Sequence, residues 1–386
     1  MQNTNNAAAL NPEEIQRYSR HLLLPEVGIA GQQKLKHSQV LVIGAGGLGC
    51  PVLLYLAAAG VGHLGIVDDD KVDLSNLQRQ VLFSVGDLDK SKALVAQEKI
   101  QALNPNTAVT VYQTRLNSAN ALEIFKNYDV IVDCTDNFAT RYLSNDACVI
   151  LGKPNVYASI FRFDGQLSIF NYRNGPCYRC LYPTPPPPEL VPSCAEGGVV
   201  GILPGVLGTL QATEVIKILL DIGDVMAGRL LTFDALTMSF DEYQLKRNHN
   251  CTFCSTSTSE RKLIDYQEFC GIPAAQNNSQ DIPSIQPMAL KHLLSTGEPI
   301  QLIDVRSISE HQIANIKEAQ LLPLDSLEQE ILDLDKHAKT ICFCHKGKRS
   351  QKACEILLQH GFSNILNLSG GIDRWSLEAS IETPRY

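Results

Sequence analysis

The sequence lacks an excess of positive charge. Its 33 lysines and arginines are outnumbered by 41 acidic residues, so the formal net charge is −8 at pH 7. Nonspecific binding of nucleic acid needs a basic surface to neutralise phosphates, so it is not expected as a main role. The first residues, MQNTNNAAALNPEE, contain neither a basic region nor an apolar core, and no secretory signal is expected there.

Long hydrophobic runs are also missing. The most apolar stretch, residues 197–210, is short and contains Pro204, so no membrane span is predicted. We therefore expect a cytoplasmic protein, in which the 12 cysteines do not form a disulfide framework. With 386 residues, 44% hydrophobic and 19% charged, the chain is expected to fold into two globular domains.

Strands and helices are predicted to alternate in the first part of the chain. The apolar run 39–43 enters the turn GAGGLG, a helix begins near Leu48, and the runs 64–70, 107–113 and 129–137 add further strands. This alternation predicts a mainly parallel α/β sheet of Rossmann-like type with helices on both faces. Open sheets of this kind bind ligands at the carboxyl ends of their strands.

The pattern changes further along the chain. The run PTPPPPEL at 183–190 can be neither a regular helix nor a central strand. A helix is predicted at 207–220, and the polar stretch 255–284 is expected to contain an interdomain linker. A second α/β pattern begins at Ile285. The predicted limits of the first domain, the linker and the second domain are therefore 11–254, 255–284 and 285–386.

The turn GAGGLG matches a nucleotide-binding fingerprint. Gly44, Gly46 and Gly49 let the backbone approach phosphate, and the next helix directs N–H groups and its positive dipole end there. Asp68 lies at about the spacing of an acid that binds ribose hydroxyls. The same glycines also fit a tight turn without a ligand, or an NAD-dependent oxidoreductase. A dehydrogenase does not need the polar groups that follow: SNLQRQ at 75–80, Lys92, and DCTDN at 133–137.

Four cysteines form two CxxC knuckles. Cys177 and Cys180 pair by spacing with Cys251 and Cys254, which predicts a tetrahedral Zn²⁺ site. Four thiolates leave no open coordination position, so the metal is expected to be structural rather than catalytic. The alternative is a set of paired thiols without metal.

Several motifs taken together resemble the ubiquitin-activating superfamily, in particular the MoeB/ThiF family of sulfur-carrier adenylyltransferases. The motifs are RYSRH, GAGGLGC, AGVG, DLSNLQRQ, DCTDN, PCYRC and NHNCTFC, and the likeness covers about residues 11–254. The resemblance implies a homodimer that uses ATP and Mg²⁺. Its substrate would be the C-terminal carboxylate of a small ubiquitin-like sulfur-carrier protein ending in Gly-Gly, which it would adenylate.

The same resemblance assigns roles to single residues. It implies that Asn76, Arg79 and Lys92 bind the triphosphate and that Asp136 binds Mg²⁺; attack on an α-phosphate needs such charge compensation. Arg20 is implied to reach the ATP site of the partner subunit, although it also fits a solvated helix residue. The full set expected at the nucleotide is Gly44, Gly46, Gly47, Gly49, Asp68, Ser75, Asn76, Gln78, Arg79, Lys92, Asp136 and Asn137.

One isolated cysteine stands out by its position. Cys194 lies in VPSCAEGGV, just after the proline run. An isolated cysteine is usually inert, but exposure on a loop favours a reactive thiolate. The family places in this loop a cysteine that attacks the carrier's acyl-adenylate or forms an acyl persulfide with it. The resemblance therefore implies a covalent role for Cys194.

The second domain resembles a rhodanese over about residues 285–386. The likeness rests on LIDVR, on SEHQIANIKEAQLLPL, and on CHKGKRSQKACEILLQHGFSNILNLSGGIDRW. The loop from Cys344 to Arg349 runs from an apolar strand into a helix, so backbone N–H groups can converge on the sulfur. Together with Lys346, Lys348 and Arg349, this arrangement favours a thiolate or persulfide anion. Four residues separate Cys344 from Arg349, one fewer than in cysteine-based phosphatases, which by resemblance implies a sulfur-sized pocket.

Four other residues of this domain are expected to be structural. Asn315 stands where rhodaneses usually have a histidine with a structural role, so no loss of activity is expected. Asp304 and Arg306 are expected to form structural hydrogen bonds, and Cys342 is expected to be a buried thiol.

These observations predict an adenylyltransferase joined to a sulfurtransferase. ATP and the carrier carboxylate would give acyl-AMP and pyrophosphate, and persulfide sulfur on Cys344 would then yield a carrier thiocarboxylate. A cysteine desulfurase or thiosulfate would load Cys344. The competing interpretations are an NAD-dependent oxidoreductase and a protein-binding scaffold with an inactive nucleotide pocket. The pathway served (molybdopterin, thiamine, tRNA thiolation, or several of these) stays open.

Overall fold

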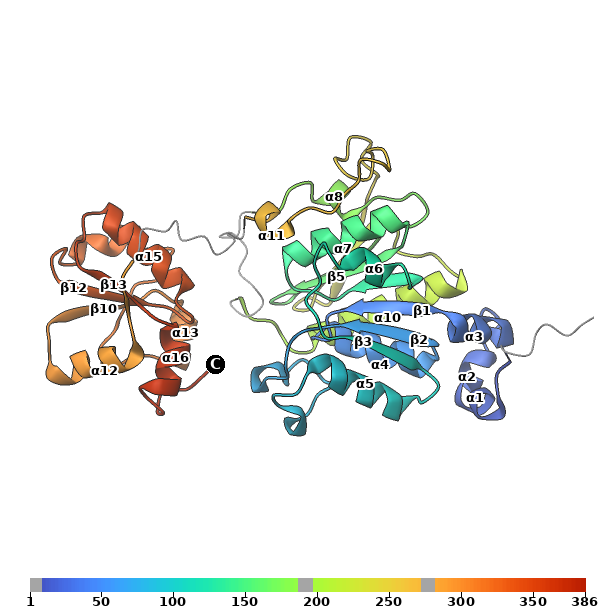
Figure 1. Cartoon of the computed structure of the whole chain (residues 1–386), viewed down its shortest axis with the longest axis horizontal. Helices are drawn as coiled ribbons and strands as arrows, with labels where there is room; N and C mark the ends of the chain where they lie inside the picture. Colours follow the sequence, from blue (N-terminus) through green and yellow to red (C-terminus); the bar gives the residue numbers. More distant parts are fainter. Residues whose placement is uncertain (1–8, 187–196, 272–281) are drawn as a thin grey trace, which may run out of the picture. The chain divides into compact units, whose positions relative to one another are not determined.

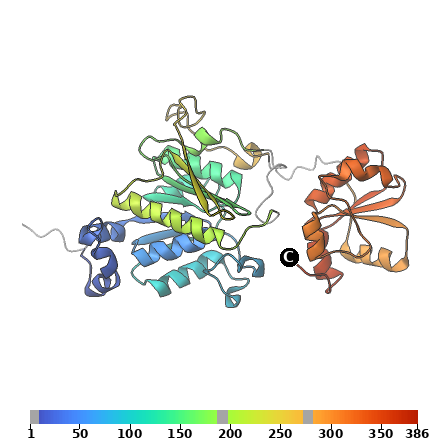
Figure 2. The same ribbon diagram turned by 180° about the vertical axis from the view of Figure 1, so that it is seen from behind.

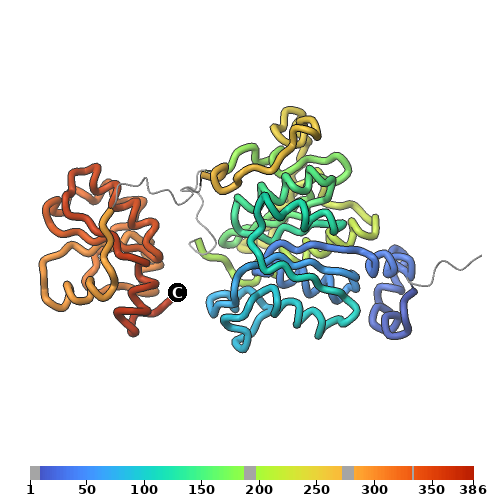
Figure 3. The backbone as a smooth tube through the Cα atoms, in the orientation of Figure 1, coloured from blue at the N-terminus to red at the C-terminus, as the bar shows by residue number. Residues whose placement is uncertain are grey.

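The computed structural model describes residues 9–186, 197–271 and 282–386. The chain divides into two compact units, Met1–Ala274 and Ala275–Tyr386. Figure 3 traces the backbone through each unit in turn. Each unit is an α/β layer structure with its own sheet.

The first unit is built on an eight-stranded sheet of order β3-β2-β1-β4-β5-β6-β7-β8. The five strands from β3 to β5 are parallel, and β6, β7 and β8 join by antiparallel pairing. The mainly parallel sheet expected from the sequence is therefore confirmed. The strands are β1 (Gln39–Ile43), β2 (His63–Val67), β3 (Ala108–Tyr112), β4 (Val130–Asp133), β5 (Asn155–Phe161), β6 (Asp164–Phe170), β7 (Arg229–Asp234) and β8 (Ser239–Gln244).

Helices cover both faces of this sheet (Figures 1 and 2). Val40 and Val42 of β1 pack into one core with α4, α5 and α10, whereas Leu41 and Ile43 pack into a second core with α6, α7 and α11. Alternate residues of a strand point to opposite faces, so each face receives one set. The helices of this unit are α1 (Pro12–Arg17), α2 (Ser19–Leu22), α3 (Gly28–His37), α4 (Gly49–Ala59), α5 (Lys92–Leu103), α6 (Ala121–Phe125), α7 (Phe138–Leu151), α8 (Tyr178–Leu181), α10 (Leu203–Leu220) and α11 (Tyr266–Phe269).

Helix α10 is longer than the sequence reading suggested. Pro204 does not interrupt it, because this residue lies in the first turn, where the missing N–H has no helical partner to lose. Among the described residues α10 is the one helix long and apolar enough to cross a membrane by length and composition, but half of it is buried inside the protein. A Cβ added at Gly208 would lie 2.6 Å from the carbonyl oxygen of Leu48, so the glycine lets α10 pack directly against the start of α4.

The first three helices lie at the amino ends of the parallel strands. The hydroxyl of Tyr18, between α1 and α2, accepts a hydrogen bond of 2.8 Å from Asn104, the residue that ends α5. A Cβ at Gly60, the residue that ends α4, would lie 2.6 Å from the Tyr18 ring. Helices α4 and α5 run back from the carboxyl edge of the sheet, so their ends mark the opposite edge.

Part of the stretch expected as a linker packs on the first unit. Tyr266 of α11 is buried, and its hydroxyl donates to the Asp146 carboxylate of α7 at 2.7 Å. Because the residues before α11 are polar, this apolar helical turn was not predicted from the sequence.

The second unit has a five-stranded, all-parallel sheet of order β11-β10-β12-β13-β9. Helices α14 and α15 contribute to the core on one face, and α12 and α16 to the core on the other. Its elements are β9 (Ser284–Ile285), α12 (Pro287–Thr296), β10 (Ile300–Asp304), α13 (Ile308–Ile313), β11 (Gln320–Leu321), α14 (Leu327–Glu330), β12 (Lys339–Phe343), α15 (Lys348–Gln359), β13 (Ile365–Leu368) and α16 (Gly371–Glu378).

Candidate functional sites

The glycine turn joins β1 to α4 and can be built only with glycine at two positions. Gly44 has a φ of +91°, a conformation that other residues rarely adopt. A Cβ added at Gly49 would lie 2.0 Å from the Gly44 carbonyl oxygen. At the end of β2, the Asp68 carboxylate accepts N–H bonds from Ala45 (2.8 Å) and Asp70 (2.9 Å). Burial raises the pKa of Asp68, and these amides and Lys92 oppose the rise.

A cavity of about 370 Å³ opens where β1, β2 and β4 end. Ligand sites in proteins have volumes of roughly 300–1,000 Å³, so the cavity falls within the range of a small-molecule site. Its lining includes these residues from the predicted nucleotide set: Gly44, Gly46, Gly47, Asp68, Arg79, Lys92, Asp136 and Asn137.

Cations and acids face each other in this cavity. The Lys92 ammonium lies 3.0 Å from the Asp70 carboxylate; the lysine side chain is 7% exposed and the aspartate 70%. Arg79 donates to the main-chain oxygen of Ser75 at 3.0 Å. Asp70 is largely solvated, so water weakens its attraction for Lys92. The positive charge of the buried lysine therefore stays available for an anionic ligand such as a phosphate.

The turn after β4 is held by hydrogen bonds that leave Asp136 exposed. The buried Asp133 carboxylate accepts bonds from the Thr135 N–H (3.0 Å) and hydroxyl (2.6 Å). Arg141 of α7 donates to the Thr135 main-chain oxygen at 3.1 Å, with its guanidinium over the Tyr157 ring. The turn therefore presents Asp136 to the cavity on a fixed backbone.

Sequence reasoning missed several residues of the cavity lining. Arg141 is four residues after Asn137 on α7, so helical spacing from DCTDN could have identified it. The stretch 114–116 follows β3 and carried no local signal. The additional lining residues include Thr114, Arg115, Leu116, Thr135, Thr140, Arg141, Ile160 and Val199.

Other predicted nucleotide residues do not line the cavity. Ser75 and Asn76 form the short 3-10 helix η1 (Leu74–Asn76), in which both bond Asp73. Gln78 packs against Gly201, where a Cβ would lie 2.3 Å from the Gln78 main-chain oxygen. Gly49 does not line the cavity, and its lack of a side chain leaves room for the Gly44 carbonyl oxygen. The roles assigned to these side chains stay predictions.

Two predicted catalytic residues are not among the described residues that line the cavity. Arg20 is exposed on α2, at the amino edge of the sheet, opposite the cavity of its own chain. Cys194 lies outside the described residues. Their roles also stay predictions.

The four knuckle cysteines converge into one cluster. Their sulfur atoms all lie within 4.8 Å of one another, with separations of 3.8 Å for Cys177 and Cys180, 3.7 Å for Cys177 and Cys251, and 3.5 Å for Cys180 and Cys254. A tetrahedral Zn²⁺ with Zn–S bonds of about 2.3 Å would require separations of about 3.8 Å. The donor set and its geometry therefore fit a closed metal centre.

Helix α7 connects this cluster to the nucleotide cavity. Arg179, between the first two cysteines, forms a buried ion pair with Asp146 of α7 at 2.7 Å. The neighbouring Asn145 accepts the Tyr178 N–H, also at 2.7 Å. Burial raises the pKa of Asp146, whereas Arg179 and Tyr266 act to lower it. The N-terminus of the same helix is capped by Asn137, which lines the cavity.

In the second unit, Cys344 lies at the end of β12 at the start of a tight loop. The Gly347 N–H donates to its sulfur at 3.1 Å, and the Ser350 hydroxyl lies 3.4 Å from it. Gly347 has a φ of +95°. Asn367 of β13 holds the loop by donating to the Gly347 carbonyl at 3.0 Å. Such dipoles stabilise a sulfur anion without a neighbouring positive charge.

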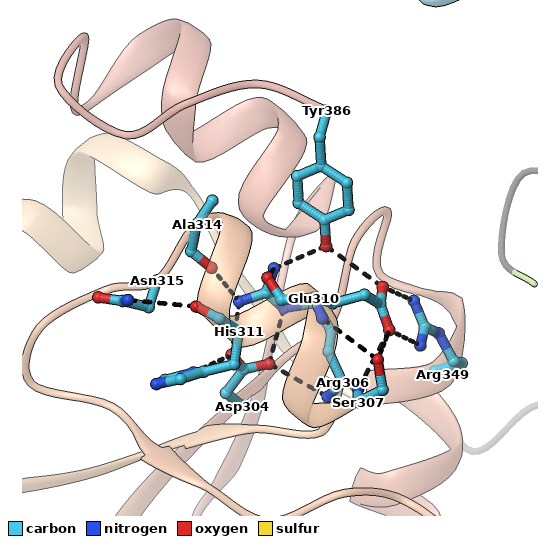
Figure 4. Close-up of polar contacts among 9 residues, drawn as sticks. All are labelled: Asp304, Arg306, Ser307, Glu310, His311, Ala314, Asn315, Arg349 and Tyr386. Atoms are coloured by element: carbon cyan, nitrogen blue, oxygen red, sulfur yellow. Dashed lines mark hydrogen bonds and ion pairs between the residues drawn. The ribbon is translucent and has the colours of Figure 1, made fainter. Parts of the chain in front are cut away.

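Arg349 points to a carboxylate rather than standing free beside the sulfur. It forms a two-pronged ion pair with Glu310 of α13 at 2.7 and 2.6 Å (Figure 4). Burial by itself would raise the pKa of Glu310, but the Arg349 and Ser307 hydrogen bonds lower it to about 2. The charge of Arg349 is therefore already compensated.

The expected structural residues behave as predicted. Arg306 is fully buried and donates to Asp304 at 2.8 and 2.5 Å. His311 lies 2.9 Å from the same carboxylate, so a histidine still contacts Asp304 even though Asn315 occupies the usual position (Figure 4). Cys342 is fully buried.

Comparison with known proteins identifies both units. A model described as the ThiF family matches residues 18–253, and a model described as the rhodanese-like domain matches residues 286–378. The "Probable adenylyltransferase/sulfurtransferase MoeZ" of Mycobacterium tuberculosis (strain ATCC 25618 / H37Rv) is 45% identical over 98% of this chain and 97% of its own length. The "Sulfur carrier protein adenylyltransferase" of Thermus thermophilus is 54% identical over 67% of this chain and 98% of its own.

Further similarity extends to an insect protein and to solved structures. The "Adenylyltransferase and sulfurtransferase MOCS3" of Culex quinquefasciatus is 41% identical over 98% of this chain and 90% of its own length. The crystal structure of E. coli MccB with ATP shares the fold, with a TM-score of 0.55 and 23% identity over 65% of this chain and 75% of that one. The resemblance inferred from the sequence motifs is confirmed: the chain belongs to the ThiF family and carries a C-terminal rhodanese-like domain.

Proposed function

We propose that this protein adenylates the C-terminal Gly-Gly carboxylate of a small ubiquitin-like sulfur carrier and then converts it to a thiocarboxylate. One observation carries the proposal: a single chain joins a charged nucleotide-sized cavity to a buried cysteine whose sulfur accepts the Gly347 N–H and lies 3.4 Å from the Ser350 hydroxyl. Relatives named for both activities align with the chain over 98% of its length.

The first half-reaction uses the cavity of the first unit. The glycine turn and the start of α4 would bind phosphate, Asp68 would bind the ribose, and Lys92 and Arg79 would offset the charge of the triphosphate; that five of these residues line one cavity, Gly44, Gly46, Asp68, Arg79 and Lys92, supports these roles. Mg²⁺, held by Asp136, would neutralise further phosphate charge. The carrier carboxylate then attacks the α-phosphorus, and pyrophosphate leaves. In the proposed homodimer, Arg20 of one subunit completes the site of the other.

The second half-reaction uses Cys344. After a cysteine desulfurase or thiosulfate has loaded it, its terminal persulfide sulfur attacks the acyl-adenylate carbonyl and AMP leaves. The product is an acyl disulfide on Cys344. The Cys194 thiol would attack the Cys344 sulfur, which releases the carrier thiocarboxylate and leaves a disulfide between the two cysteines that a cellular thiol must reduce before the next turnover. The four-cysteine cluster has the sulfur separations that a tetrahedral Zn²⁺ requires, which supports Zn²⁺ as a structural metal. We also propose that the enzyme acts in the cytoplasm.

The decisive assay is ATP–pyrophosphate exchange with a Gly-Gly-tailed carrier. Exchange is expected with the intact carrier and not with a matched carrier that lacks the last glycine. No exchange with any Gly-Gly carrier, or reduction of NAD by the purified protein, would favour the scaffold or the oxidoreductase interpretation instead.

A further inference from the structure

Tyr386, the last residue of the sequence, contacts the loop from Cys344 to Arg349, here called the sulfur loop, although it is not part of that loop. Its hydroxyl accepts a hydrogen bond from Arg306 at 2.7 Å and donates to Glu310 at 3.2 Å (Figure 4). Its ring stacks on the His345 imidazole, with centroids 4.6 Å apart and planes inclined by 18°. Its main-chain oxygen accepts from Nε2 of His345 at 2.9 Å.

The anchor on the far side of Tyr386 is rigid. The Arg306 guanidinium is fully buried, with the Asp304 carboxylate on one side and the Ala314 main-chain oxygen at 2.7 Å on the other. A side chain bound to so many partners has few alternative positions, so Tyr386 is attached to a fixed point of the unit.

From this anchor, Tyr386 reaches both ends of the sulfur loop. His345 directly follows Cys344 in the chain. Glu310, the other partner of the tyrosine hydroxyl, forms the two-pronged ion pair with Arg349, which lies in the first turn of α15. Gly347, whose N–H is directed at the sulfur, lies between these two held positions.

We propose that Tyr386 is a positioning residue for sulfur transfer: it fixes His345 and, through Glu310, Arg349, and so keeps the Gly347 N–H aimed at the sulfur of Cys344. This inference rests on the proposed sulfurtransferase role of Cys344. The polar and ring contacts described for Tyr386 are with Arg306, Glu310 and His345 and not with the Cys344 sulfur, so Tyr386 acts on the rate by holding the loop.

The contact also sets the charge next to Cys344. Because the Tyr386 oxygen accepts the Nε2–H, neutral His345 carries its proton on Nε2. Burial lowers the pKa of His345; the Tyr386 oxygen, Asp373 and Glu310 oppose this, and Lys346 adds to it. Removal of the tyrosine ring exposes the imidazole, and its pKa then returns towards an ordinary value of about 6.5.

The test uses the full chain and follows thiocyanate formed from thiosulfate and cyanide. Tyr386→Ala is expected to lower kcat about tenfold with little change in KM, because a loosened loop misplaces the N–H donor. Tyr386→Phe keeps the stacked ring and the main-chain acceptor and should recover most of the rate. Thr383→Ala is the matched control, because Thr383 bonds only Ser380 among the described contacts of the same terminal segment.

Two further measurements separate positioning from folding. ATP–pyrophosphate exchange should be unchanged in all three variants. The ratio of kcat/KM between wild type and Tyr386→Ala should vary between pH 5.5 and 7.5, reporting an ionisation near the ordinary histidine value of about 6.5. Wild-type kinetics in Tyr386→Ala, equal losses in Tyr386→Ala and Thr383→Ala, or a ratio independent of pH would overturn the proposal. An inactive wild type would instead contradict the function proposed for Cys344.

Discussion

The ion pair between Glu310 and Arg349 gives the second unit a defined dependence on pH. The pKa of Glu310 falls from the usual 4.5 to about 2 in the folded protein. A group whose pKa is lowered on folding contributes stability above its unfolded pKa and loses it as the pH falls towards the folded pKa. Each unit of pKa corresponds to about 1.4 kcal/mol, so the contribution is about 3 kcal/mol at pH 7, of which about 2 kcal/mol is lost by pH 3.

The measurement is urea unfolding at several pH values between 7 and 3, followed by tryptophan fluorescence. Trp375 is the single tryptophan of the chain and is 5% exposed in the core of the second unit, so its signal reports that unit alone. Glu310→Gln removes the ionisable group and should flatten the dependence of the unfolding free energy on pH by about 2 kcal/mol over this range. Glu328→Gln, at an exposed position, serves as the control and should keep the wild-type slope.

A parallel loss of stability in Glu310→Gln and wild type between pH 5 and pH 3 would exclude the ion pair as the cause of the pH dependence. That result would mean that Glu310 has the same pKa in the folded and the unfolded chain. A flattened slope in Glu328→Gln as well would show that net charge, and not the ion pair, controls the effect.

Three further predictions follow from the first unit and from the cysteines. Asp136→Ala should abolish ATP–pyrophosphate exchange while circular dichroism stays unchanged, because the side chain is exposed at the turn after β4; normal exchange would exclude it as the Mg²⁺ ligand. Metal analysis of protein purified under reducing conditions should find one Zn²⁺ per chain, and Cys251→Ser should lower both metal content and thermal stability, since structural zinc contributes about 10–16 kcal/mol in small zinc domains; a metal-free protein of unchanged stability would count against the site. Cys344→Ala should abolish thiosulfate sulfurtransferase activity and thiocarboxylate formation but leave ATP–pyrophosphate exchange intact. Cys194→Ala should also leave exchange intact but slow sulfur transfer to the carrier. Thiocarboxylate production at the wild-type rate by Cys344→Ala, with thiosulfate as the sulfur source, would exclude the second unit as the sulfur donor.

Features that depend on local stereochemistry could be predicted from the sequence. Gly44 and Gly49 are required by a turn of six residues, and no distant contact is needed to recognise it. The four zinc-type cysteines were recognisable because the CxxC spacing itself fixes the geometry of each half of the site. The parallel sheet followed from the alternation of apolar runs, since only a crossover helix can connect such strands.

Features that depend on the meeting of distant segments could not be predicted. Arg349 was expected to support the sulfur anion, but Glu310, 39 residues earlier, takes up its charge. Tyr386 carries no sequence signal at all, because its role arises from Arg306, which is 80 residues away. The helical turn at Tyr266 escaped notice because its polar flanks resemble a linker, and its burial depends on Asp146, which is 120 residues away.

Helix α7 connects the four-cysteine cluster to the cavity of the first unit, although no cysteine of the cluster lines that cavity. Its 14 residues span about 21 Å, and an α-helix of that length moves almost as a rigid rod. Asn145 and Asp146, in the middle of the helix, hold it to the cysteine knuckle, while Asn137 and Arg141, at its N-terminal cap and in its first turn, shape the turn after β4. We expect a displacement of the knuckle to shift the helix and, with it, the Asn137 edge of the cavity. Substitutions in the cysteine knuckle and substitutions in the cavity are therefore not expected to behave as independent changes in this enzyme.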